Sequence, residues 1–308
     1  MQKYADYLRA NTHNYGDTLL YYARAHSATK IQEVLRVLVA HCLIKSVAYP
    51  ALSDLDQSLS SLITTPKQTL TKLTAQDTEA AAILSQHLSG YATIRKFYDL
   101  RDEDVLLTKR DKPTTRPMAR KRAAAAALMV VISSAASSIQ GGLYDADIET
   151  VIQVDVLLPL LGEALVFLNQ PKRAFSLRHL YDLLAAIEDF ETSGALIRNQ
   201  CEEVLQTALG AAHGDTSVPE PRSLLQKSTS GLSGSTFSLI GSQDFSTDAQ
   251  STQASAVLVR GGKVSDVQRG WDWRAGCPRG TQGRELLRIL RLGVAREVAR
   301  CFAEGEMQ

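Results

Sequence analysis

The stretch Thr18–Tyr49, TLLYYARAHSATKIQEVLRVLVAHCLIKSVAY, indicates how this chain folds. Its large apolar residues recur at helical spacing, as expected for a helix face that is buried against a core. They are Leu19, Leu20, Ile31, Val34, Leu35, Leu38, Val39 and Cys42. Because proline lacks a backbone N–H group and clashes with the preceding turn, we expect this long helix to end or kink at Pro50.

The same periodicity predicts further helices over most of the chain. They are expected at 51–63, 74–100, 118–139, 145–169, 176–190, 193–210 and 284–303, the fourth with a kink at Pro159. Thr74 and Ser176 are expected to be N-caps, and Thr64–Pro66 to break the chain between two helices. Strands do not alternate with helices, which argues against an α/β fold. We therefore predict an all-α protein, either an irregular helical bundle or a short helical stack.

The composition is that of an ordinary globular protein without a charge bias. The 308 residues carry 34 Lys and Arg against 33 Asp and Glu, a net charge of +1, and 44% of them are apolar. A net charge near zero excludes a global signature of nucleic-acid or membrane-surface binding, although local basic patches can still exist. The chain is long enough to bury a core without disulfides or metals.

Neither a cofactor nor a metal site is expected from the sequence. The cysteines are Cys42, Cys201, Cys277 and Cys301. They lie far apart without CxxC or zinc-finger spacing, so we interpret them as reduced intracellular thiols near the core. The N-terminus shows no signal peptide, and four serines interrupt the most apolar stretch, 123–139. We expect an intracellular protein with no membrane span.

Changes in composition along the chain suggest five segments. They are an N-terminal helical segment (1–108), a basic connector (109–122), a second helical segment (123–212), a Ser/Thr-rich linker (213–256) and a C-terminal Trp/Arg module (257–308). The linker has too few large apolar residues to offset the entropy of ordering it, so we expect it to be disordered.

The basic connector contains two clusters of cations across a proline-containing spacer. They are Lys109 with Arg110, and Arg120, Lys121 and Arg122. This spacing resembles a bipartite nuclear-import signal, in which an extended polycation lies along an acidic receptor groove. Contact with phosphate or an acidic partner and a plain solvated connector are the alternatives. The resemblance favours the nucleus over the cytoplasm.

The C-terminal module combines the only tryptophans of the chain with a row of arginines. The residues expected to contact a partner are Trp271, Trp273, Arg274, Arg284, Arg288 and Arg291. Tryptophan is a frequent hot-spot residue, because its ring buries a large area at low entropic cost. The alternative is a helix packed on its own core with exposed arginines. We also expect the module to dock on the helical body, steered by the acidic stretch 143–169.

Catalytic motifs are missing from the sequence. No HExxH or GxSxG pattern occurs, and 260–263 is too short for a phosphate-binding loop. We interpret the carboxylates Glu188, Asp189 and Glu191 as a solvated helix face.

These observations favour a non-enzymatic helical interaction protein, a scaffold or subunit of an intracellular multiprotein complex, with other proteins as its partners. One alternative is association with nucleic acid through 109–122 and 263–300, which the neutral net charge disfavours. The other is an enzyme whose site is assembled from dispersed helices.

Overall fold

The structure, a computed structural model, describes residues 1–106, 116–214, 221, 225 and 272–304. The α-helices are α1 (Gln2–Asn11), α2 (Tyr15–Arg24), α3 (Ala28–Lys45), α4 (Gln57–Thr64), α5 (Pro66–Thr74), α6 (Thr78–Leu106), α7 (Pro117–Ala136), α8 (Leu157–Ala164), α9 (Leu177–Thr192), α10 (Ala195–Ala212) and α13 (Gly283–Ala303). Short 3₁₀ turns are η1 (Leu52–Asp54), η2 (Val154–Val156), η3 (Leu165–Phe167) and η5 (Trp273–Gly276). The predicted all-α class is confirmed.

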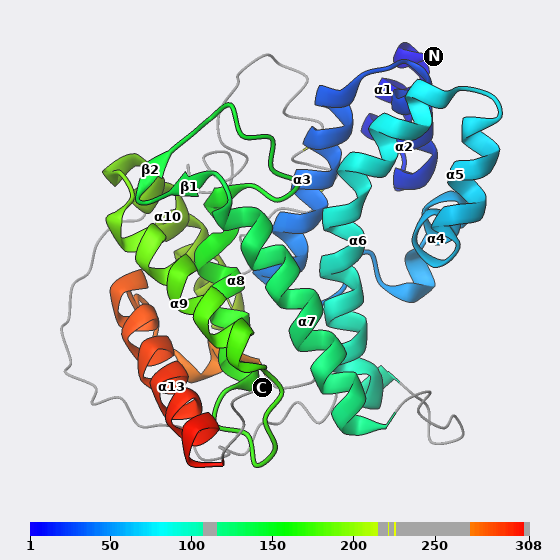
Figure 1. The fold of residues 1–308 in the computed structure, drawn as a ribbon. Helices are drawn as coiled ribbons and strands as arrows, with labels where there is room; N and C mark the ends of the chain where they lie inside the picture. The colour runs from blue at the N-terminus through cyan, green and yellow to red at the C-terminus, as the bar shows by residue number, and fades with distance from the viewer. Residues whose placement is uncertain (107–115, 215–220, 222–224, 226–271, 305–308) are drawn as a thin grey trace.

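The helices lie side by side in a short stack (Figure 1). Helices α6 and α7 form its middle and pack against each other. On one side, α2, α3 and α5 pack against α6, while α8 and α9 pack against α7 on the other side and α13 covers both. Helix α3 also contacts α8 and α10, so one continuous apolar core runs through the stack.

The stretch 18–49 forms two helices, so the expected single helix is wrong at one point. Helix α2 ends at Arg24, and α3 begins at Ala28. Between them His26 has a φ of 52°, a left-handed conformation that interrupts the helical hydrogen bonds. The apolar spacing in the sequence continues across this break, because each of the two helices turns an apolar face toward the core. Periodicity alone therefore could not locate the turn.

The break expected at Thr64–Pro66 is present, but Pro66 begins a further helix, α5, which the sequence analysis missed. Proline suits the first helical position, because the N–H group that it lacks would be unpaired there. Thr74 ends α5, so its assignment as an N-cap is wrong. The capping role belongs to Asp77, whose Oδ1 accepts from the backbone N–H of Ala80 at 2.9 Å.

The helix expected over 145–169 is also shorter than predicted. The chain first forms a small antiparallel hairpin, β1 (Ile139–Gln140) with β2 (Leu143–Tyr144), which is the only sheet within the described residues. The side chain of Asp145 then accepts from the N–H of Asp147 at 2.9 Å, an Asx turn that competes with a helix. Regular helix begins only at α8.

The predicted capping of α9 by Ser176 is confirmed. Its hydroxyl accepts from the N–H of His179 at 3.2 Å, and the ring of His179 lies 3.5 Å from the N–H of Ser176, completing a capping box. The predicted C-terminal helix is present as α13.

The expected linker 213–256 and the first connector cluster lie almost entirely outside the described residues, and the segment boundaries stay predictions.

A buried polar cluster joins α3, α6 and α8 at the centre of the stack. The carboxylate of Glu163, which is fully buried, accepts hydrogen bonds from Ser46 Oγ at 2.7 Å, Tyr98 OH at 3.0 Å and Arg101 Nη1 at 2.9 Å. Arg101 also pairs with Asp102, with Nε 2.8 Å from Oδ1. A buried charge needs such partners, because an isolated one would lose its hydration without compensation.

One buried histidine should make the stability depend on pH. Burial lowers the pKa of His41 to about 4, with a smaller contribution from the charge of Lys45, whereas in the unfolded chain the pKa is near 6.5. Between these values the unfolded state binds the proton and the folded state does not, so stability falls as the pH is lowered. The loss should reach about 2 kcal/mol at pH 5 and about 3 kcal/mol near pH 4.

Urea unfolding of the wild type and of His41→Phe at pH 7 and pH 5 checks this expectation. The variant keeps an aromatic ring against Tyr49, whose ring centroid lies 4.2 Å from that of His41, but it cannot titrate. The wild type should lose about 2 kcal/mol more than the variant between the two pH values. Equal losses in the two proteins would show that His41 does not control this transition.

Candidate partner-docking surface

The C-terminal segment 272–304 is docked on the helical body through a buried tryptophan. The side chain of Trp273 is 1% exposed and lies over Gly162 of α8. A Cβ atom at position 162 would lie 2.5 Å from the indole ring, so only glycine lets the ring approach this closely. The indole Nε1 has no hydrogen-bond partner within the described residues, so apolar packing carries this contact.

The neighbouring residue, Arg274, fixes the same segment to the end of α3. Its guanidinium donates to the backbone carbonyls of Ile44 and Lys45, the latter at 2.9 Å. Asp272 holds the guanidinium from the other side, with Oδ2 2.6 Å from Nη2. The last carbonyls of a helix lack partners inside the helix and carry its negative dipole end, so a buried cation stabilises them.

Docking of the C-terminal module is therefore confirmed for residues 272–304, but its steering by the acidic stretch is not what the structure shows. Trp273 packs on α8, which belongs to 143–169, whereas no ion pair joins 272–304 to that stretch within the residues described. Instead Arg291 pairs with Glu188 at 3.0 Å and Glu191 at 2.7 Å on α9. Two of the three carboxylates on this solvated face thus form surface ion pairs with α13.

An open groove of about 1,030 Å³ runs between the α9–α10 turn region and the first half of α13. Arg284, Arg288 and Arg291, which the sequence analysis selected, all line it, together with Arg198 from α10. Arg284 and Arg288 are exposed, and neither has an ion-pair partner within the described ranges. We call this surface the arginine groove.

An exposed leucine lines the arginine groove. It is Leu292, which is 59% exposed. Cations without partners beside an exposed leucine are the chemistry expected for docking an acidic segment that carries an apolar side chain.

The residues expected to contact a partner thus divide into three arginines that line the groove and two residues that are buried. Trp273 and Arg274 are buried inside the molecule and cannot contact a partner without opening the fold. Trp271 lies outside the described residues. The signal that could have separated these roles is Gly162, because a glycine in a leucine-rich helix indicates a close approach by another group.

The residues of the import-like motif also differ in exposure. Arg120 is 3% exposed and its Nη1 lies 3.4 Å from Glu103 Oε2, so it belongs to the packing of α7 on α6. Lys121 and Arg122 are exposed, and Lys109 and Arg110 lie outside the described residues. The import role stays a prediction that rests on the exposed cations.

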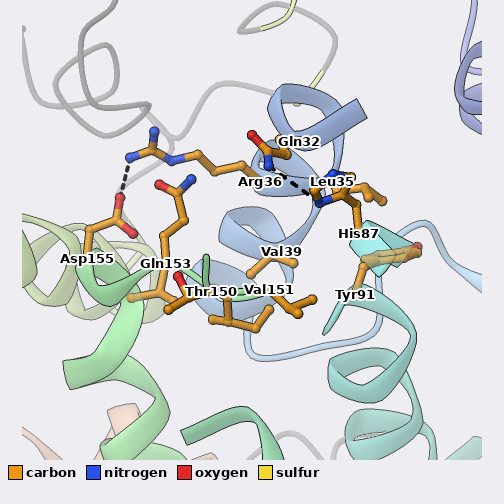
Figure 2. Close-up of a pocket in the computed structure, with 12 residues that line it drawn as sticks. Gln32, Leu35, Arg36, Val39, His87, Tyr91, Thr150, Val151, Gln153 and Asp155 are labelled. Carbon is orange, nitrogen blue, oxygen red and sulfur yellow. Dashed lines mark hydrogen bonds and ion pairs between the residues drawn. The ribbon is translucent and has the colours of Figure 1, made fainter. Parts of the chain in front are cut away.

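A narrow cavity of about 40 Å³ lies between α3, α6 and the segment 150–156 (Figure 2). Figure 2 shows Arg36 reaching Asp155, with Nη2 2.5 Å from Oδ2, and Gln32 pointing to His87 across 3.5 Å. Arg36 Nε and Asp155 Oδ1 are buried, and neither has a hydrogen-bond partner among the residues that the structure describes. The cavity has room for ordered water that could serve both atoms, but not for an organic substrate. No motif in the sequence points to these residues.

The thiols are buried, as the sequence analysis expected. All four cysteines are free, and burial raises the pKa of Cys42 to about 12 and that of Cys277 to about 11. Such thiols are poor nucleophiles, because the thiolate is the reactive form. Within the described ranges, no group of three or more His, Cys, Asp or Glu side chains could hold a metal ion. None of the helices in the described ranges is long and apolar enough to cross a membrane.

Comparison with known proteins gives one informative similarity. The chain is 38% identical over 313 residues to nucleoporin NUP85 of the fungus Chaetomium thermophilum. The alignment covers 98% of this chain and 26% of the nucleoporin, so the chain spans about a quarter of the length of that relative. No family model matches the sequence, and no solved structure matches it.

Proposed function

We propose that this chain is a non-enzymatic scaffold subunit of a large protein assembly of the nucleoporin type. The observation that carries this proposal is the 38% identity to a nucleoporin over 98% of the chain. An identity that extends from end to end argues for a shared helical framework rather than for a shared short motif. The similarity lends no support to association with nucleic acid.

The architecture supports the same proposal. A stack of helices with one continuous core presents exposed faces on which other proteins can dock. The nuclear envelope is the location that a nucleoporin relative implies for the assembly, which agrees with the import-like cations of the connector.

We further propose that the arginine groove is one of the surfaces that hold a neighbouring subunit. Arg284 and Arg288 have no ion-pair partner within the described residues, and Leu292 adds an exposed apolar contact beside them. The segment that fits is acidic and carries at least one large apolar side chain. Charge complementarity would guide the encounter, and burial of the leucine would supply affinity.

Charge reversal tests this assignment. The double variant Arg284→Glu, Arg288→Glu should lose at least about tenfold in the recovery of one partner when the tagged chain is purified from its native cells. The fold should stay intact, because both side chains are exposed and make no ion pair in the described structure.

The matched control is Lys67→Glu, Lys72→Glu on α5, at the opposite edge of the stack, where both lysines are exposed as well. It changes the net charge by the same amount and should leave the recovery of that partner unchanged. Equal recovery with both variants, or equal loss with both, would reject the groove as the docking site.

A further inference from the structure

A second open hollow, of about 620 Å³, lies where three distant regions of the chain meet. Its cations are Arg122 from the first turns of α7, Lys172 and Arg173 from the loop before α9, and Arg300 from the end of α13. Among the described residues, Glu304 is the carboxylate in its lining. We call this surface the basic hollow.

The position of Glu304 shows where an anion is held in the basic hollow. Its carboxylate lies 3.0 Å from Arg173 Nη2 and 3.4 Å from Arg300 Nε. Arg300 is itself fixed, because its Nη1 donates to the backbone carbonyl of Gln170 at 2.8 Å and its Nη2 to that of Pro171 at 3.1 Å. Guanidinium groups held in this way are preorganised for oxyanions.

The ion pairs of the basic hollow involve two of its cations, because Glu304 pairs with Arg173 and Arg300, and Glu297 lies 3.3 Å from Arg300. Arg122 and Lys172 are exposed, and no ion pair engages either of them within the described residues. The first turn of α9 adds to the positive potential, since Ser176 and His179 line the hollow at the positive end of the helix dipole.

We propose that the basic hollow binds a polyphosphorylated group, either in a soluble organic phosphate or in the headgroup of a phosphoinositide. Arginine forks and a lysine point charge are the side chains that recognise phosphate oxygens. A ligand with several phosphates can engage Arg122 and Lys172 together while Arg173 and Arg300 hold a further phosphate beside or in place of Glu304. The aperture is open, so a headgroup can enter while its lipid stays in a membrane.

Isothermal titration of the full chain with inositol hexakisphosphate at physiological salt tests the proposal, with inorganic phosphate as the weak reference. Flotation with vesicles of phosphatidylcholine, with or without phosphatidylinositol 4,5-bisphosphate, forms the second arm. Saturable binding in either arm is expected, and the arm that responds identifies the source of the phosphate. The variant Arg122→Glu, Lys172→Glu should weaken that binding at least about tenfold, because two of four cations become anions.

The variant Lys67→Glu, Lys72→Glu on α5 is the matched control, because it changes the net charge by the same amount away from both surfaces and should bind as the wild type does. No binding in either arm would overturn the proposal, and so would an equal loss in both variants, which would indicate general electrostatic attraction. Tighter binding of a single-stranded RNA oligonucleotide that depends on the same two residues would also overturn it in favour of nucleic acid. Circular dichroism confirms that each variant is folded.

Discussion

Replacing Trp273 with alanine is expected to destabilise the protein by about 3–5 kcal/mol and to release residues 272–304 from the body. The indole ring is 1% exposed and rests on the backbone of α8 at Gly162, so its removal leaves a large apolar cavity. Arg274 could still donate to the carbonyls at the end of α3, but the buried ring beside it that anchors the segment would be gone. Urea unfolding followed by circular dichroism measures the change in free energy.

A double-mutant cycle with Gly162 shows whether the contact is the one described. Gly162→Ala alone should destabilise by about 1–3 kcal/mol, because the added Cβ would lie 2.5 Å from the ring. In the Trp273→Ala background the same methyl group has space, so it should cost much less, with an interaction energy above about 0.5 kcal/mol. Strict additivity would contradict the proposed packing of Trp273 on Gly162.

The second large effect is expected at Glu163. Changing it to alanine removes the acceptor shared by Ser46, Tyr98 and Arg101 and leaves a buried guanidinium with one carboxylate partner fewer. Breaking a buried ion pair by removing one partner destabilises by about 3–5 kcal/mol. The measurement is the urea midpoint at neutral pH, converted with the denaturant slope.

Glu188→Ala is the matched control for this prediction. Glu188 also pairs with an arginine, Arg291 at 3.0 Å, but its side chain is 67% exposed. Exposed pairs contribute about 0–1 kcal/mol, so the control should unfold nearly as the wild type does. Similar losses in Glu163→Ala and Glu188→Ala would show that the central polar cluster does not hold the stack together.

Periodicity was sufficient to predict the fold class and most of the helices, because helices that share one core need an apolar face whatever their order. Periodicity did not predict the helix boundaries at positions where local interactions set the backbone conformation. His26 in a left-handed conformation and the Asx turn at Asp145 both interrupt apolar patterns that read as continuous. Pro66 indicates a break in the chain, but it is also a favourable first residue for the next helix.

The candidate site could be predicted only in part. Arg284, Arg288 and Arg291 share one helix side, so their spacing was enough to place them on a common surface. Trp273 is buried because it packs on Gly162, which lies far away in the sequence. A single sequence does not show that these two residues are in contact. The basic hollow was missed for the same reason, since Lys172 and Arg300 meet Arg122 only in the folded chain.

If the chain acts as a subunit of a larger assembly, it should be recovered as part of that assembly. Native mass spectrometry of the tagged chain after gentle purification from its own cells measures this. Our account predicts a discrete complex, heavier than the 33.6 kDa of the chain, with other proteins in fixed stoichiometry. Recovery of the chain alone at its monomer mass, under conditions that preserve other assemblies from the same cells, would contradict it.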